Sequence, residues 1–432
     1  MSTVLDRTKP QYTTISDQHS KEHLLLTLCL LLTLIFSFRD ISQGWTAGNP
    51  FPSIVNSTLL PLVPVVAFLF FNLQGCFSPK GLSRTEIAKW VGIVMIIGVF
   101  WLTVLIERMI PSRLDTNPAW PFLLTNLLLP AWVLVGFWLG AFPAQIEMFS
   151  RKLAKILAIA SVIFTIAQYA EGYLGMFDWN WWPIRLTLLF AYFWFLYEIM
   201  VREGPGWYGS LIGWICTSSQ VIYPLHKPIV WAAAIGTLAL LLFAIIRKDL
   251  TFKRLIRLVA LLSLIVVIFI SINLYTEGSF IGEKMDSIIS TWFHLNPEDF
   301  SGMEVTNIQD LNRILGGRVS LWQGVSYRFY ESPIIGSGFY QLTILSYQTH
   351  LHNYFYDLLL GVGILGTLPI GLGLLVWFFR LFGKKRSTSP AWIVPLSAFA
   401  ISVMAYGFFG NFTLFHAPSF LMPLAIGMTL RQ

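Results

Sequence analysis

Long apolar runs, separated by short polar segments, dominate this sequence. A helix that crosses a lipid bilayer needs about 20 mainly apolar residues, and many of the runs approach that length. They do not alternate between apolar and polar residues, so a closed barrel is excluded. The pattern predicts twelve membrane-spanning helices, at approximately residues 24–38, 57–77, 90–106, 119–142, 154–170, 186–201, 207–223, 228–246, 258–274, 358–380, 391–409 and 416–430.

Composition agrees with a chain that lies mostly in lipid. Hydrophobic residues make up 55% and charged residues 12% of the 432 residues, whereas a soluble domain is about one quarter charged. The predicted fold class is therefore an all-α polytopic membrane protein. Spans 1–9 occupy residues 1–274, a loop of 77 residues with short helices occupies 275–351, and spans 10–12 occupy 352–432.

The basic residues predict how the chain is oriented in the membrane. The net charge is +7, and 20 of the 29 Lys and Arg residues fall in loops and termini on one side of the predicted bundle. Positively charged loops stay in the cytoplasm, so we expect both termini there and the long loop on the outward side of the membrane. Because the charges are spread over alternate helix ends, they encode orientation, and we expect no nucleic-acid partner.

The second half of the long loop, residues 316–339, has the pattern of an amphipathic helix, which should end at Glu331-Ser-Pro333, followed by Gly336 and Gly338. Apolar residues recur at spacings of three and four at Val319, Trp322, Val325 and Phe329. Arg318 and Arg328 lie off that face. A guanidinium keeps its charge and offers a planar fork to phosphate oxygens, so these arginines suit an anionic, lipid-linked substrate. The alternative is a salt bridge to a loop carboxylate such as Glu331.

His352 stands where a helix leaves the aqueous side and enters the bundle. A histidine in that position can act as a general base near neutral pH. The alternative is an interfacial histidine that is hydrogen-bonded to backbone.

Two groups of residues resemble landmarks of the O-antigen ligase and polymerase superfamily. The first is His352-Asn353, followed after nine residues by Gly363-Ile-Leu-Gly366. The second is the upstream set Gly317-Arg318, Trp322, Pro333 and Gly336. Their order, their place in the largest outward loop and the twelve-span layout are similar to that family as well.

The resemblance implies a metal-independent glycosyltransferase that needs no cofactor. Such an enzyme takes a glycan from undecaprenyl diphosphate on the periplasmic face and joins it to an acceptor sugar, for example on lipid A–core. Arg318 would bind the diphosphate and His352 would accept the proton of the acceptor hydroxyl. Supporting residues would be Asn353, His350, Arg328 and Trp322.

Two further cations are candidates for the diphosphate site. Arg185 begins a span on the outward side, where an unpaired charge is expensive, so either a lipid diphosphate or a loop carboxylate should meet it. The family often has an arginine near the outward junction of the seventh and eighth spans, but this chain has the uncharged Gln220 there. Lys227, or His226 if protonated, could supply a charge from the same loop.

Four functions remain open. The motif His350-Leu-His-Asn353 and the compact loop favour a ligase that transfers O-antigen to lipid A–core. A polysaccharide polymerase or a protein O-oligosaccharyltransferase would use the same chemistry. A transporter or flippase for a lipid-linked sugar could use the same arginines to bind the diphosphate without a catalytic histidine.

Overall fold

The computed structural model describes most of the predicted bundle and part of the long loop. The described residues are 82–109, 120–174, 182–201, 206–221, 227–252, 329–338, 342–344, 347–349, 353–382, 390–410 and 416–432, with isolated positions at 254–263 and 322–326. The predicted spans 24–38 and 57–77, and most of 258–274, lie outside them.

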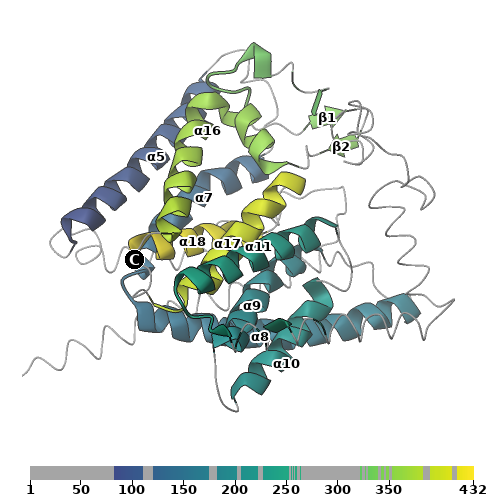
Figure 1. The fold of residues 1–432 in the computed structure, drawn as a ribbon. Coiled ribbons are helices and arrows are strands. Elements are labelled where there is room, and N and C mark those ends of the chain that lie inside the picture. The colour runs from purple at the N-terminus through teal and green to yellow at the C-terminus, as the bar shows by residue number, and fades with distance from the viewer. Residues whose placement is uncertain are drawn as a thin grey trace, which may run out of the picture.

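Helices account for nearly all of the described structure (Figure 1). They are α5 (Arg84–Arg108), α7 (Trp120–Leu139), α8 (Pro143–Leu174), α9 (Trp182–Val201), α10 (Gly206–Val221), α11 (Lys227–Ile246), α16 (Tyr354–Leu381), α17 (Ile393–Phe409) and α18 (His416–Arg431). In the long loop, β1 (Leu342–Ile344) and β2 (Tyr347–Thr349) form an antiparallel pair in which Thr343 lies opposite Gln348.

Each predicted span between residues 84 and 246, and each after residue 353, coincides with one of these helices. Within the described residues, three segments are long and apolar enough to cross a membrane, namely Arg84–Ile106, Pro228–Ile246 and Tyr354–Leu381. Counting the bent pair α7 and α8 as one span, with 119° between its two parts, gives a fourth. The helical membrane architecture is confirmed, while the number of twelve spans stays a prediction.

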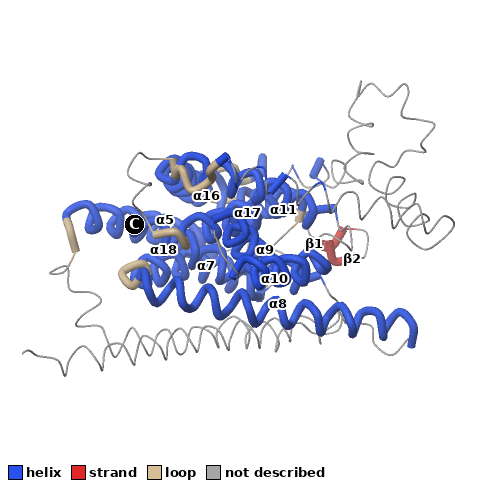
Figure 2. Tube along the Cα trace, turned by 60° about the horizontal axis from the view of Figure 1, so that its bottom comes forward, coloured by secondary structure: helices blue, strands red, loops and turns tan. Residues whose placement is uncertain are grey.

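Helix α9 is the centre of the bundle. Every residue from 185 to 200 is buried, and the helix packs against α8, α10, α11, α17 and α18. In Figure 2, α8 lies along one side of the bundle. A helix that is apolar around its whole circumference and buried throughout has no lipid-facing stripe. Helix α9 is therefore the buried central helix of the described bundle, and these five helices pack around it.

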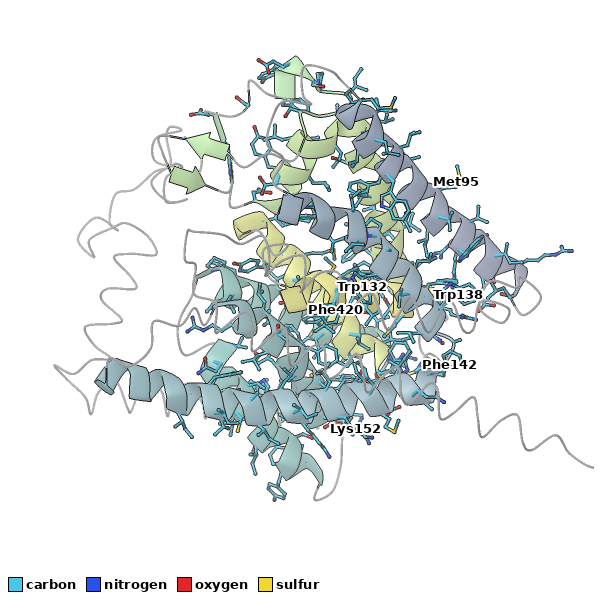
Figure 3. All side chains as sticks on the ribbon, turned by 180° about the vertical axis from the view of Figure 1, so that it is seen from behind. Met95, Trp132, Trp138, Phe142, Lys152 and Phe420 are labelled. Atoms are coloured by element: carbon cyan, nitrogen blue, oxygen red, sulfur yellow. The ribbon has the colours of Figure 1, made fainter. Side chains whose placement is uncertain are left out.

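Small residues allow the closest helix contact, between α7 and α18. A Cβ atom on Gly136 would overlap the backbone of Leu424, and one on Gly427 would overlap the carbonyl oxygen of Val133. Without hydrophobic driving force between helices in lipid, such backbone approach is a main source of packing energy. The rings of Trp132 and Phe420, 5.4 Å apart between centroids, lie in the same contact (Figure 3).

An ionic cluster joins one end of α18 to α5. Arg431 Nε lies 3.1 Å from Glu86 Oε1, and Lys89 Nζ donates a 2.8 Å hydrogen bond to the Arg431 carbonyl oxygen. Residues 86 and 431 come from opposite ends of the described sequence. These contacts therefore join the first described helix to the last one.

Candidate functional site

The start of α16 positions the residues that follow the long loop. Asn353 caps the helix, and its Oδ1 accepts a 3.1 Å hydrogen bond from the backbone N–H of Tyr356. An asparagine side chain at this position satisfies one of the N–H groups that an α-helix leaves free at its beginning. Asn353 therefore fixes where the helix begins, immediately after His352. His350 and His352 lie outside the described residues.

Helix α16 is broken at Gly363. This residue has φ 62° and ψ −167°, which is not helical, and in Figure 1 the helix bends near its upper end. The break leaves the carbonyl oxygens just before Gly363 and the N–H groups just after it without partners inside the helix. In lipid such groups must be satisfied by the protein itself.

The segment Pro333–Gly338 of the long loop supplies the missing partners, and we call this arrangement the loop clamp. The N–H groups of Ser337 and Gly338 donate to the carbonyl oxygens of Leu360 and Gly361, at 2.7 and 3.1 Å. In the other direction, the N–H groups of Ile364 and Leu365 donate to loop carbonyl oxygens, both at 2.9 Å. The loop thus caps both pieces of the broken helix.

The accepting carbonyls for Ile364 and Leu365 belong to Pro333 and Ile334. Two glycines make this approach of the two backbones sterically possible. A Cβ atom on Gly336 (φ 77°) would lie 2.5 Å from the Gly363 nitrogen, and one on Gly363 would overlap the Gly336 nitrogen. The two family landmarks, which are separated by 26 residues between Gly336 and Gly363, are therefore in direct backbone contact.

Trp322 adds a second connection between the loop and the start of α16. Its carbonyl oxygen accepts a 3.3 Å hydrogen bond from Tyr356 Oη, and the two rings lie 6.3 Å apart in an edge-on arrangement. Described positions between 322 and 331 are helical and the helix has ended by Ser332, as the amphipathic pattern predicts. Arg318 and Arg328 lie outside the described residues, so their roles stay predictions.

Arg185 lies near the beginning of α9 and is 5% exposed. Within the described part of the chain, its buried Nε has no hydrogen-bond partner, and no described carboxylate pairs with the guanidinium. The sequence left two partners open for Arg185, a lipid diphosphate or a loop carboxylate. No described carboxylate is the loop partner of Arg185. A buried cation is costly unless an anion meets it. Most of the loop carboxylates lie outside the described residues, so both partners stay predictions.

Gln220, near the end of α10, forms a side-chain hydrogen bond to helix α8. It is 1% exposed, and its Nε2 donates a 2.8 Å hydrogen bond to Thr165 Oγ1 of α8. Thr165 and Ser219 are also within hydrogen-bond distance, at 3.1 Å between their hydroxyl oxygens. This polar cluster holds α8 and α10 together without contributing a charge. Lys227 is the first residue of α11, but its side chain lies outside the described structure.

Sequence reasoning missed the loop clamp and the contact of Tyr356. Gly336 and Gly363 were visible as family landmarks, yet nothing in their spacing indicates that they meet. No three described His, Cys, Asp or Glu side chains come together to hold a metal ion. Metal independence stays a prediction.

Comparison with known proteins gives a family match for the middle part of the chain. Residues 218–371 match the family model described as O-antigen ligase. No curated protein matches the chain. The matched range begins before Gln220 and includes the long loop, the clamp and the first part of α16, and Arg185 lies upstream of it. The resemblance drawn from the two landmarks is confirmed.

The loop clamp predicts that Gly363 tolerates no side chain. Gly363→Ala should destabilise the protein by about 2 kcal/mol or more, because its backbone conformation is strained for alanine and the Cβ overlaps Gly336. Hydrogen exchange should accelerate at the amides of Ser337, Gly338, Ile364 and Leu365. The matched control is Gly371→Ala, in the same helix and with open space around its Cβ. Unchanged exchange at all four amides of Gly363→Ala would contradict the clamp.

Proposed function

We propose, from the O-antigen ligase domain that residues 218–371 carry, that the protein is a membrane glycosyltransferase that uses undecaprenyl-diphosphate-linked glycan as its donor. Within this class we propose the ligase, which joins O-antigen to lipid A–core at the periplasmic face of the inner membrane. The observation that carries the proposal is Arg185, a buried guanidinium without a described partner. A diphosphate provides the charge-assisted hydrogen bonds that such a group lacks.

The proposed reaction is a single displacement at the anomeric carbon of the donor sugar. The acceptor hydroxyl oxygen forms a bond to that carbon, and the bond from carbon to the diphosphate oxygen breaks. His352 takes the proton of the hydroxyl as a general base. Negative charge develops on the departing diphosphate, and preorganised cations that are kept from water stabilise it most effectively. Arg185 and Arg318 would supply this charge, with Lys227 as a further cation.

The loop clamp supports the role proposed for His352. A general base has to lie within hydrogen-bond reach of the proton that it removes, so the backbone around it must be held. Asn353 caps α16 directly after His352, and the first piece of α16 is tied to the loop by the clamp and by Tyr356. In this arrangement the loop that carries Arg318 and the helix that follows His352 form one unit.

Arg185→Met should separate stability from function. Removing a buried charge that has no described partner should leave the free protein equally stable or more stable, while binding of undecaprenyl diphosphate weakens at least tenfold. The measurements are thermal unfolding in detergent and binding of the carrier lipid.

The control for this variant is Arg151→Met, another arginine on the bundle. Arg151 Nε lies 3.4 Å from Glu198, whose side chain is 8% exposed, so its removal leaves a buried carboxylate short of a partner and should lower the stability of the protein. If Arg185→Met is destabilised as much as Arg151→Met and binds carrier lipid normally, Arg185 has a structural role instead.

His352→Ala distinguishes the transferase from a transporter of lipid-linked sugar. Loss of a general base should lower the rate of glycan transfer about a hundredfold or more, with insertion and carrier-lipid binding retained. The assay is product formation by purified protein in liposomes that contain the donor and lipid A–core. Unimpaired transfer by this variant would rule out the catalytic role, and carrier movement across the bilayer without transfer would favour the transporter.

Deletion of the protein distinguishes the ligase from a polymerase. If it is a ligase, extracts of the deletion strain should contain long glycan that remains on the carrier, because only the last transfer is lost. Gel analysis of carrier-linked and lipid A-linked glycan in the same extract measures both pools. Loss of the long chains from the carrier itself would instead establish a polymerase.

A further inference from the structure

The exposed side of α8 changes from basic to apolar along the helix. Lys152 and Lys155 are exposed, and they are followed by Ile159, Ile163 and Ile166, which are 64%, 54% and 64% exposed. Spacings of three and four residues place these side chains on one side of a helix. Two ammonium groups thus continue directly into a strip of branched aliphatic side chains.

A hollow lies at the basic end of this strip. It has a volume of about 390 Å³, and its described lining comes from α8 alone, namely Ala144, Glu147, Met148, Arg151, Lys152 and Lys155. Figure 3 shows Lys152 on the side of α8 that is turned away from α7 and α18. With respect to the described helices, the space therefore lies on the outer side of α8.

The hollow is lined by more positive than negative side chains, and its carboxylate is already paired. Glu147 is paired with Arg151, whose Nη2 lies 3.0 Å from Glu147 Oε1, and the Nε of Arg151 also lies near Glu198. Within the described residues, neither Lys152 nor Lys155 forms a hydrogen bond or an ion pair. The carboxylate in the hollow is thus compensated, and two positive charges remain in excess.

We propose that this side of α8 binds an anionic phospholipid of the bilayer. The headgroup phosphate lies between Lys152 and Lys155, and an acyl chain lies along Ile159, Ile163 and Ile166. Basic pockets at the ends of transmembrane helices attract anionic headgroups, and the aliphatic strip requires a ligand with a long apolar chain attached to its charge. Inorganic phosphate would use only half of the surface.

The site is separate from the transfer reaction proposed above. Lys152 and Lys155 belong to the predicted cytoplasmic set of basic residues, whereas Arg185, Arg318 and His352 belong to the outward side. Lipid binding can therefore be measured without donor, acceptor or glycan transfer, and the result does not depend on whether the protein is a ligase.

The test uses the full-length protein in detergent, titrated with dioleoyl phosphatidylglycerol or with dioleoyl phosphatidylcholine. Native mass spectrometry counts the lipid that is retained. Wild type should bind the anionic lipid preferentially. In Lys152→Gln/Lys155→Gln the apparent dissociation constant for phosphatidylglycerol should rise about twenty-fivefold, the product of roughly fivefold for each ammonium group near the membrane surface. Phosphatidylcholine binding should change little.

The matched control is Arg84→Gln/Lys248→Gln, which removes two exposed positive charges from the ends of other helices. It should keep the wild-type preference for phosphatidylglycerol. An equal loss in both double variants would overturn the proposal, because net charge alone would then explain the binding. Displacement of the lipid by millimolar inorganic phosphate would also overturn it, since the site would then recognise free phosphate without the chain.

Discussion

Backbone hydrogen bonds across the break in α16 are the interaction on which the candidate site depends. A broken helix exposes polar backbone groups, and in a membrane each unsatisfied group costs several kcal/mol. Here Pro333–Gly338 provides both the donors and the acceptors that the break at Gly363 requires. The loop segment and the helix are consequently a single structural unit, although the residues that contact each other are far apart in sequence.

The central helix α9 carries a buried charged residue near each end, and the two residues differ in how many partners they have. Near its last turn, Glu198 is surrounded by partners, with Ser210 Oγ donating at 2.7 Å, Trp194 Nε1 donating at 3.2 Å and Arg151 at 3.4 Å. Near its first turn, Arg185 is equally buried but lacks such partners among the described residues. The satisfied end is characteristic of structural packing. The end that carries Arg185 would be completed by an anion, and none of the described residues supplies one.

Much of this architecture could be predicted from the sequence, because bilayer thickness leaves few options for an apolar run. The predicted span 228–246 and the helix Lys227–Ile246 differ at their beginning by a single residue. The end of the amphipathic helix near Ser332 followed from Pro333 and Gly336, residues that seldom continue a helix. Asn353 was predicted as a supporting site residue, which stays a prediction, and its capping of α16 is a finding of the structure.

Other features depend on contacts between distant segments, which periodicity does not encode. The sequence marked Gly336 and Gly363 as family landmarks but predicted a continuous helix through Gly363, and neither the break there nor the contact with Gly336 was predicted. Likewise, Gln220 was recognised as uncharged where the family often has an arginine, yet its bond to Thr165 depends on how α8 and α10 pack. For Arg185 the sequence identified the cost of burial and left the partner open. Only the packing of α9 shows that no described carboxylate reaches it.

The break in α16 also changes which part of the helix crosses the bilayer. The piece after the break, Ile364–Leu381, has 18 residues and is about 27 Å long at 1.5 Å per residue, close to the roughly 30 Å of a hydrocarbon core. That piece alone can span the membrane. Tyr354–Val362 is therefore not needed to cross the hydrocarbon core, and the helix start that Asn353 caps can lie at the edge of the bilayer.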